Sequence, residues 1–489
     1  MNTSVYNELT KIVGTDRVTN KQELLEHLLG EHGFTERELP SLLVWPSSAE
    51  EISQIVELAN KSYFPLIPIS SGTPRMNGGS IPKVKGTVIL DLSRMNRIIR
   101  VDSKNKVVMI EPGVTYGQLL PELKKAGLRP LMPLLPKASQ SVLASCLDRE
   151  PTTIPRFHWD ASDPLLCTET IFGTGEMLRT GSASGPGSLE EQWASGQAQK
   201  NPMGPSQFDP FRLIQGSQGT IGIVTWITMK CEIAPDLHRV FLSGADTLES
   251  LQEFNYAVIR RRLADEHFIL NSRFLSEALG NDLVDSISEW ILVLGLSGHG
   301  SLFQDEFDYR LGDTKEIATE NGVYLEEKIG DVKSDDIQKL LNVPSSEPYW
   351  KIRSYGACKE VHFSSTLDEI PYLHKTFLAV AKDSGVEQDR IGVYVQPTVQ
   401  GVNAYCFFDI YYNPQDEKEV ANTEKLYVSG SEKLMESAAF FSRPPDVLRD
   451  SVYSRVSPEV LKAMNRVKRI FDPNNVLSPG NLCFEEVLK

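Results

Sequence analysis

The sequence has no apolar run that approaches the roughly 18 residues needed to span a bilayer. Candidates such as residues 290–296 have only the length of a strand. The opening residues, MNTSVYNELTKIVG, show no basic region followed by an apolar core, so we expect no secretory signal. Basic residues are outnumbered, and the net charge of −15 argues against nucleic acid and anionic membranes as partners, because both need a basic face.

Cysteine pairs are also missing. The six cysteines show neither CxxC nor CxxxC spacing, which excludes a local iron–sulfur or zinc-ribbon motif, and we expect no metal site. Scattered cysteines suit a reducing compartment, so we expect a cytoplasmic protein.

The 489 residues are enough for two or three domains, and no internal repeat is evident in the sequence. The N-terminal half alternates predicted helices and strands. Ser48 to Glu51 forms a capping box that predicts a helix, and Leu66 to Ile69 reads as a short strand that ends in a glycine-rich loop at residues 70–79. Residues 87–92 and 107–111 are strand-like, and a second capping box begins a helix at Thr115.

The middle and C-terminal parts have a different predicted secondary-structure pattern. Residues 131–162 and 181–205 are predicted to be long loops on either side of a hairpin at 169–180, and 223–233 is predicted to be β-rich. After about residue 238 the pattern is α+β. Near the end, Ser457 and Pro458 predict the start of an amphipathic helix. Its apolar face is expected to contain Val460, Leu461, Met464, Val467 and Ile470.

The glycine loop is the first candidate site. A strand that runs into small residues exposes successive backbone N–H groups, which can bind a pyrophosphate, and Arg75 could supply a counter-charge. The spacing is not GxGxxG, so this is no Rossmann fingerprint. Taken alone, such a loop is more often a simple turn.

The order of several motifs carries more information than this loop. Residues 46–52 precede it, and Leu90 to Asn96, Glu111 to Thr115, Gly175 to Gly181, Gly216 to Val224 and Asp472 to Asn475 follow it in turn. This series resembles the vanillyl-alcohol oxidase / p-cresol methylhydroxylase (PCMH) superfamily of FAD enzymes. The resemblance implies an α+β fold with a PCMH-type split FAD-binding domain of two α+β subdomains and a ferredoxin-like α+β cap. The implied divisions are 1–237 for the FAD-binding domain, 238–444 for the cap and 445–489 for a segment that returns to the first domain.

The resemblance also assigns cofactor contacts. The pyrophosphate would lie against the glycine loop, which comprises Ser70, Ser71, Gly72, Thr73, Pro74, Arg75, Met76, Asn77, Gly78 and Gly79. The flavin ring would lie against Pro112, Gly113, Ser141, Ser145 and Cys146. The adenine and ribose side would contact Gly219, Gly222, Ile223 and Val224, and Asn475 would complete the pocket.

The catalytic positions depart from both familiar branches. The phenol-oxidising branch has an acid shortly before the position of Ser141, where this chain reads Leu134-Leu-Pro-Lys-Ala-Ser139. That branch also has a Tyr-Arg pair, where this chain reads Phe440-Phe-Ser-Arg443, so the arginine is present and the tyrosine is not. The hydroxyacid dehydrogenase branch has a metal-binding pair of histidines in the cap, and none of the eight histidines here stands in such a motif.

Arg443 is the candidate anion clamp, since a guanidinium suits a carboxylate or phenolate, and a surface salt bridge is the competing interpretation. His362 or Glu360 is the candidate base, although a core or surface histidine is the commoner case. The same applies to His158 in the long loop. The glycine loop has no histidine for covalent attachment, so we expect dissociable FAD, with attachment through a cap His or Tyr left open.

These features predict hydride transfer from a small alcohol, 2-hydroxy acid or phenolic substrate to FAD, with oxygen, an acceptor protein or a quinone taking the electrons. The alternative is an FAD-binding electron-transfer or scaffold subunit with a degenerate substrate site. A chain that binds no flavin is a third hypothesis. A homodimer is compatible with the resemblance.

Overall fold

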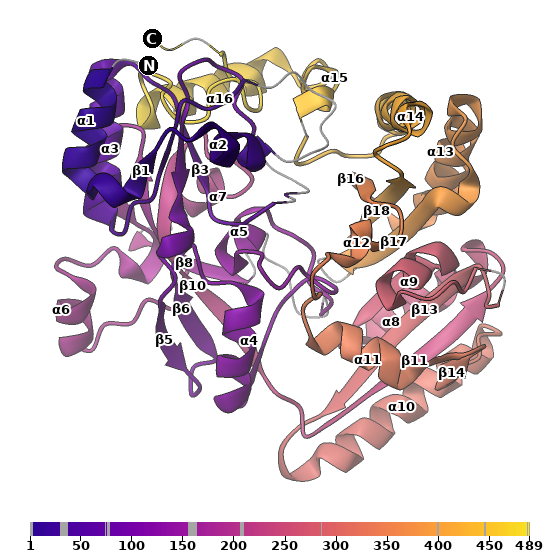
Figure 1. The fold of residues 1–489 in the computed structure, drawn as a ribbon. Helices are drawn as coiled ribbons and strands as arrows, with labels where there is room; N and C mark the ends of the chain where they lie inside the picture. The colour runs from indigo at the N-terminus through magenta and orange to yellow at the C-terminus, as the bar shows by residue number, and fades with distance from the viewer. Residues whose placement is uncertain are drawn as a thin grey trace.

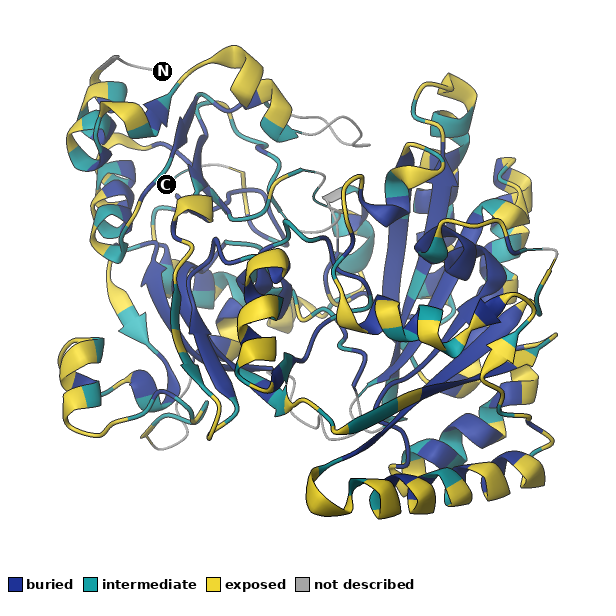
Figure 2. Ribbon diagram, turned by 60° about the horizontal axis from the view of Figure 1, so that its bottom comes forward, coloured by how far each residue is buried: buried dark blue, intermediate teal, exposed yellow. Residues whose placement is uncertain are grey.

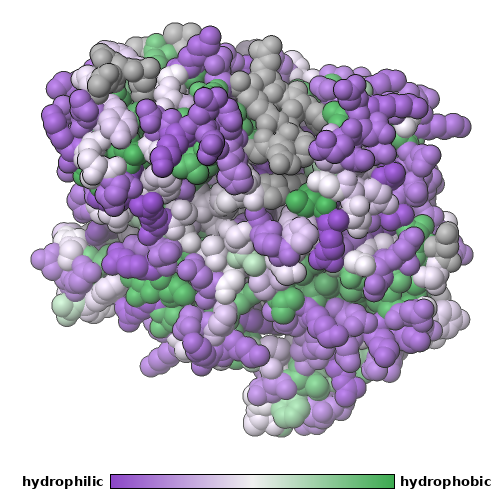
Figure 3. Space-filling view, in the orientation of Figure 1, coloured by the Kyte–Doolittle hydropathy of each residue, from purple (hydrophilic) through white to green (hydrophobic). Residues whose placement is uncertain are grey.

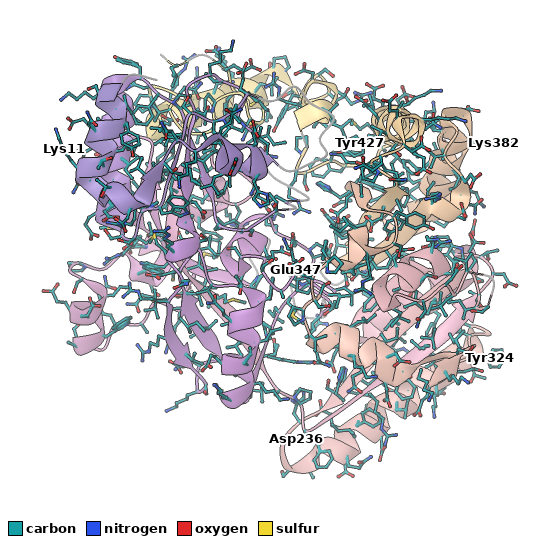
Figure 4. The ribbon with its side chains drawn as sticks, in the orientation of Figure 1. Lys11, Asp236, Tyr324, Glu347, Lys382 and Tyr427 are labelled. Atoms are coloured by element: carbon teal, nitrogen blue, oxygen red, sulfur yellow. The ribbon has the colours of Figure 1, made fainter. Side chains whose placement is uncertain are left out.

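The computed structural model describes residues 3–29, 38–73, 75, 79–154, 164–205, 210–284, 286–398, 401–444, 446–486 and 488. These residues form two lobes (Figure 1). The N-terminal lobe contains the residues before 234 and the C-terminal segment from 446, and the cap contains the chain between β11 and Phe441. Asp236, labelled in Figure 4, marks the crossing from one lobe to the other. Within the described ranges, no helix combines the length and apolar character that a membrane crossing requires.

A four-stranded sheet supports the glycine loop. Its order is β1 (Val18–Thr19), β2 (Leu42–Val44), β4 (Val88–Asp91) and β3 (Leu66–Ile69), with β2, β4 and β3 parallel. The predicted helix is α3 (Ala49–Ser62), and the Ser48 side chain accepts a hydrogen bond from the backbone N–H of Glu51. Helices α1 (Thr3–Val13) and α3 share one apolar core with this sheet, and α2 (Gln22–Leu29) lies nearby. The strand–helix alternation expected from the sequence is therefore confirmed here.

The second sheet of this lobe is six-stranded. Its main path is β5 (Ile98–Asp102), β6 (Val107–Ile110), β10 (Gly222–Ile233), β8 (Leu165–Phe172) and β9 (Met177–Arg179), and β7 (Leu128–Pro130) pairs with the end of β10. The predicted hairpin is the β8–β9 pair. Helix α4 (Tyr116–Lys125) begins with both hydrogen bonds of the predicted Thr115–Gln118 capping box. It buries Tyr116, Leu119 and Leu123 against the sheet.

The cap repeats one topology that the sequence does not reveal. The first unit is β11 (Leu237–Ala245), α8 (Gln252–Arg261), β12 (His267–Asn271), β13 (Trp290–Gly298) and α10 (Phe303–Glu320). The second is β16 (Ala357–Ser365), α13 (Ile370–Ser384), β17 (Ile391–Thr398), β18 (Asn403–Tyr412) and α14 (Glu417–Glu436). Both units follow a βαββα order, with one further helix (Ser272–Leu279) inserted between β12 and β13 of the first, and they join through β12 and β17 into one sheet of order β11-β13-β12-β17-β18-β16.

The two faces of the cap sheet have separate cores. One face packs against α8, α10, α13 and α14. The other packs against α9 (Ser272–Leu279), α11 (Ser334–Asn342) and α12 (Trp350–Arg353), and this second face is turned toward the N-terminal lobe. Figure 2 shows most strands of both lobes buried and the outer helix faces exposed, and the face in Figure 3 is mostly hydrophilic.

Three expectations need correction. The stretch 131–162 contains a short helix, α5 (Val142–Leu147), and 181–205 contains α6 (Leu189–Ala194). Both are six-residue helices begun by a serine N-cap, too short to show a helical apolar period. The C-terminal helix α16 (Pro458–Phe471) begins at the predicted cap, but its predicted apolar face is only partly buried, with Leu461, Met464 and Val467 half-buried. Val460 and Ile470 are exposed, and its one fully buried side chain is Lys468.

Lys468 forms a buried ion pair that joins the C-terminal segment to the N-terminal lobe. Its Nζ lies 2.5 Å from Oδ2 of Asp472 and donates to the carbonyl oxygens of Thr220 at 2.6 Å and Leu477 at 2.8 Å. Asp472 also accepts from the backbone N–H groups of Val476 at 2.9 Å and Leu477 at 2.8 Å. This turn places Leu477 beside Leu66 of β3, the strand that leads into the glycine loop. The pair therefore connects β3, the 216–222 loop and the C-terminus.

Replacing Asp472 by alanine leaves Lys468 buried without its counter-ion and two backbone N–H groups without their acceptor. We expect the free energy of unfolding to fall by about 3–5 kcal/mol, measured by urea denaturation. Glu436→Gln removes the exposed Lys433–Glu436 pair and serves as the control, with little change expected because solvent screens that pair. Equal stability of the two variants would contradict the structural role of the buried pair.

Candidate functional site

A cavity of about 240 Å³ lies between the two lobes. The N-terminal lobe lines it mainly with residues from three segments, the glycine loop and its strand (68–80), the 133–151 stretch and the 214–224 stretch, together with Leu92 and Pro112. The cap contributes Phe274, Tyr349, Trp350, Lys351, Glu360, Tyr394 and Phe407. The lobes are bridged beside this cavity, where the backbone N–H of Ala138 donates to Ser345 O at 3.0 Å. Glu347, next to that bridge, lies between the lobes in Figure 4.

Two cations meet at the glycine-loop end of the cavity. Arg75 Nε donates to Ser80 Oγ at 3.0 Å, and Lys137 Nζ donates to the carbonyl oxygen of Thr73. Burial lowers the pKa of both side chains. Glu347 opposes this at Lys137, with 3.8 Å between Nζ and Oε1, whereas the charge of Arg75 lowers the pKa of Lys137 further. Two enclosed, mutually repelling cations make this end of the cavity suited to an anion.

The middle of the cavity presents two carboxyl groups from the segment after α5. Glu150 accepts from Ser145 Oγ at 2.6 Å and from Gln140 Nε2 at 3.0 Å. Burial raises the pKa of Glu150, and it raises the pKa of Asp148 to about 6 although the nearby Arg443 lowers it. This part of the cavity therefore holds two carboxyl groups whose pKa values are raised by burial, Asp148 to about 6.

The cap end combines aromatic walls with one compensated cation. Lys351 Nζ donates to Glu360 Oε1 and lies 2.9 Å from Oδ2 of Asp409. The same ammonium is 4.9 Å from the ring centre of Phe407 and 5.3 Å from that of Trp350. The positive charge of Lys351 is thus already matched by two carboxylates and two aromatic faces.

Of the three predicted catalytic residues, only Glu360 lines the cavity. Arg443 lies behind it, donates through Nη1 to the carbonyl oxygen of Asp148, and packs 5.2 Å from the ring centre of Tyr405. His362 Nε2 donates to the carbonyl oxygen of Arg443 at 3.0 Å. Burial, more than the Arg443 charge, lowers the pKa of His362 to about 3, so this histidine is neutral at physiological pH. His158 lies outside the described residues.

The predicted cofactor residues divide into three groups. Those that line the cavity are Ser70, Ser71, Gly72, Arg75, Gly79, Pro112, Gly219, Gly222, Ile223 and Val224. Those placed in the surrounding structure are Thr73, Gly113, Ser141, Ser145, Cys146 and Asn475. Ser141 caps α5, and Gly113 packs so closely that a Cβ would lie 2.2 Å from Ser93 O. Pro74, Met76, Asn77 and Gly78 lie outside the described residues.

Five charged residues of the site were missed by the sequence prediction: Lys137, Asp148, Glu150, Lys351 and Asp409. Lys137, Asp148 and Glu150 lie in the stretch 131–162, which was predicted to be a long loop. Lys351 and Asp409 come together from positions 58 residues apart, and no local pattern marks them. Among the described residues, no cluster of three or more His, Cys, Asp or Glu could hold a metal ion.

Comparison with known proteins agrees with this geometry. Residues 40–181 match the family described as FAD binding domain, and residues 449–482 match FAD linked oxidases, C-terminal domain. Among curated proteins, the mitochondrial D-lactate dehydrogenase [cytochrome] of Arabidopsis thaliana is 22% identical over 98% of this chain and 80% of its own length. The 4-cresol dehydrogenase [hydroxylating] flavoprotein subunit of Pseudomonas putida is 22% identical over 90% of this chain and 87% of its own length.

Among solved structures, substrate-bound p-cresol methylhydroxylase superposes with a TM-score of 0.86 at 17% identity, covering 99% of this chain and 97% of that one. Together with the two domain matches, these relatives define the class of the protein as an FAD-linked oxidoreductase. The two domain matches and the fold shared with p-cresol methylhydroxylase agree with the PCMH-type superfamily that the motif order predicts.

The residues present fit FAD. The paired charges of Arg75 and Lys137 suit the two negative charges of a pyrophosphate, and they stand beside a loop of small residues. Gly72 and Gly216 leave space there, since a Cβ on either would meet no atom within 4 Å. FAD therefore has both room and counter-charges at this end of the cavity.

Lys137→Met tests this fit, because it removes one of the two cations without adding bulk. We expect the Kd for FAD to rise about 10- to 100-fold, since a hydrogen bond to a charged group contributes about 1.5–3 kcal/mol. The measurement is a titration of the apoprotein with FAD, followed by flavin fluorescence. Lys375→Met, which removes an exposed ion pair with Glu249 in the cap, is the matched control. An unchanged affinity in Lys137→Met would separate this lysine from the cofactor.

Proposed function

We propose that this protein oxidises a small, uncharged aromatic alcohol or phenol, passing hydride from the substrate to FAD. The carrying observation is the cap end of the cavity, where Phe274, Tyr349, Trp350, Tyr394 and Phe407 form the walls. Aromatic walls of this kind favour a flat apolar substrate and exclude water.

The charges of the cavity favour an uncharged substrate over a 2-hydroxy acid. A hydroxy acid brings a carboxylate, which requires an available cation. Lys351 is matched by Glu360 and Asp409, and Arg443 lies outside the cavity lining. Asp148 and Glu150 would repel a second carboxylate. The named activities of the relatives include both D-lactate and 4-cresol dehydrogenation, and this charge pattern supports the phenol or alcohol side for the present chain.

The residues of this chain supply binding and orientation. Bound FAD supplies the two-electron acceptor for the hydride. Arg75 and Lys137 would balance the negative charge of the cofactor's pyrophosphate. The Lys351–Glu360 pair at the cap end would then face the substrate. We further propose dissociable FAD, a cytoplasmic location, and a protein or quinone as the final electron acceptor.

The alternative, an electron-transfer or scaffold subunit with a degenerate site, rested on the missing acid and tyrosine. Asp148, Glu150 and Glu360 place carboxyl groups in the cavity from other positions, which argues against degeneration. An enclosed aromatic wall with no substrate to bind would also be an unusual feature to retain.

Anaerobic mixing with candidate substrates tests the proposal. We expect 4-alkylphenols and benzylic alcohols to bleach the visible absorbance of the bound flavin, and D-lactate and glycolate to leave it oxidised. The physical reason is the lack of an available cation for the carboxylate at the cap end. Faster bleaching by a 2-hydroxy acid would overturn the substrate class, and no bleaching by any of these compounds would favour the electron-transfer alternative.

A further inference from the structure

Glu360 and Asp409 face each other across two strands of the cap sheet. They are directly paired partners in the antiparallel ladder of β16 and β18, so their side chains project from the same face. Like charges directly opposite each other destabilise a sheet. Lys351, from α12, lies between them, with Nζ 3.1 and 2.9 Å from the two Asp409 oxygens and in contact with Glu360 Oε1. We call Lys351, Glu360 and Asp409 the cap triad.

The cap triad has one more carboxyl group than cations. Its side chains are at most 6% exposed, and Asp409 is fully buried. A net negative charge is costly in such a place, so the buried triad favours holding one proton on its two carboxyl groups. Burial raises the pKa of Asp409 to about 7, although Lys351 opposes this. Burial also acts to lower the pKa of Lys351, but the two carboxylates outweigh it and hold that pKa well above its ordinary value.

One member of the pair is open to the cavity. Glu360 and Lys351 line it, whereas Asp409 lies behind them and also accepts from Tyr411 Oη at 3.4 Å. A substrate hydroxyl between the aromatic walls would therefore contact Glu360. Asp409, which does not line the cavity, would influence the protonation of Glu360 through its own charge.

The other titratable and charged groups around the triad come from both lobes. They are Tyr349 before α12, Cys358 and His362 on β16, Tyr394 on β17, Tyr411 on β18, Glu277 on α9, Tyr427 on α14 and, from the N-terminal lobe, Glu150. Burial raises the pKa of the tyrosines, the cysteine and Glu150 and lowers that of His362. The tyrosines, the cysteine and the histidine are thus held in their neutral forms.

We propose that the cap triad is the proton acceptor of the oxidation, with Glu360 as the catalytic residue that contacts the substrate hydroxyl and Lys351 and Asp409 as positioning residues. This inference rests on the proposed function. In the step, the substrate O–H bond breaks and its proton passes to the carboxylate of the triad. The oxidised carbon loses hydride, with both electrons of its C–H bond, to bound FAD, and the electron pair of the O–H bond becomes the new π bond. The triad passes from a net charge of −1 to 0.

The pH dependence follows from this charge change. The triad accepts a proton only in its deprotonated form, so the rate of flavin reduction should rise with pH through an inflection near the Asp409 pKa of about 7. Asp409→Asn leaves Glu360 paired with Lys351 and removes the carboxylate directly opposite it, so the triad takes up its proton at lower pH, although Glu150 remains nearby. Lys351→Met leaves two carboxyls without their cation, which raises the pKa of the pair.

The decisive experiment compares these two variants in the holoprotein. Anaerobic stopped-flow reduction by the best phenol or alcohol should show the inflection moved down by at least one pH unit in Asp409→Asn and up in Lys351→Met. Glu360→Gln should reduce the rate about 100-fold or more at every pH. Shifts that are absent or in the same direction would overturn the proposal.

A readout without turnover accompanies the kinetics. Infrared difference spectra of the holoprotein should show the C=O band of a protonated carboxyl group that disappears as pH rises through 7 in the wild type. This band should be absent at the same pH in Asp409→Asn. Asp148→Asn tests whether the Asp148 carboxyl, in the same cavity, is the proton acceptor in place of the cap triad. If it alone shifts the kinetic profile and removes the band, Asp148 is the acceptor and the triad is not.

Different results would contradict the proposed function and the proposed role of the cap triad. If no uncharged substrate reduces the wild-type flavin while the band titrates as described, the proposed function is wrong and the shared proton stands. If the flavin is reduced with a profile that ignores Asp409→Asn and Lys351→Met, the function stands and the triad's role is wrong.

Discussion

The buried contact between Lys468 and Asp472 is the constraint on which the rest of this molecule depends. It fixes the turn that places Leu477 beside β3. Through the Thr220 carbonyl it also holds the 216–222 loop. Strand β3 and this loop both line the cavity where FAD fits. The chain leaves the N-terminal lobe at about residue 234 and returns more than 200 residues later, and this ion pair joins the returning segment to the strand and loop that line the cavity. Removing either partner leaves an uncompensated charge in the interior.

The two ends of the cavity have opposite excess charge. At the glycine loop, Arg75 and Lys137 form a surplus of positive charge that a dianionic pyrophosphate can neutralise. At the cap, Lys351 is outnumbered by carboxyl groups, and a proton can restore neutrality. Cofactor binding and substrate chemistry are therefore separated by the sign of the local charge, and the acidic middle with Asp148 and Glu150 keeps a second anion away from the substrate end.

The sequence predicted the parts of this structure that local chemistry encodes. Capping residues such as Ser48 and Thr115 marked helix starts, and the order of the motifs indicated the superfamily and FAD. The burial of Lys468 in the last helix was not predicted, because the partners of this lysine come from elsewhere in the chain. The charged site residues were missed for the same reason. Lys351 can be recognised as a site residue only from its contact with Asp409, and tertiary packing creates that contact.

The twofold repetition within the cap has a consequence for how substrate preference can change. The halves meet at a short seam, where only Ile269 with Val395 and Leu270 with Tyr394 are paired, and the cavity lies over that seam. The first half offers Phe274 to the cavity, the second offers Tyr394, Phe407 and Glu360, and Lys351 comes from α12 between the two halves. A substitution at Phe274 can therefore resize the pocket while Glu360, on the other copy of the folding unit, is left intact.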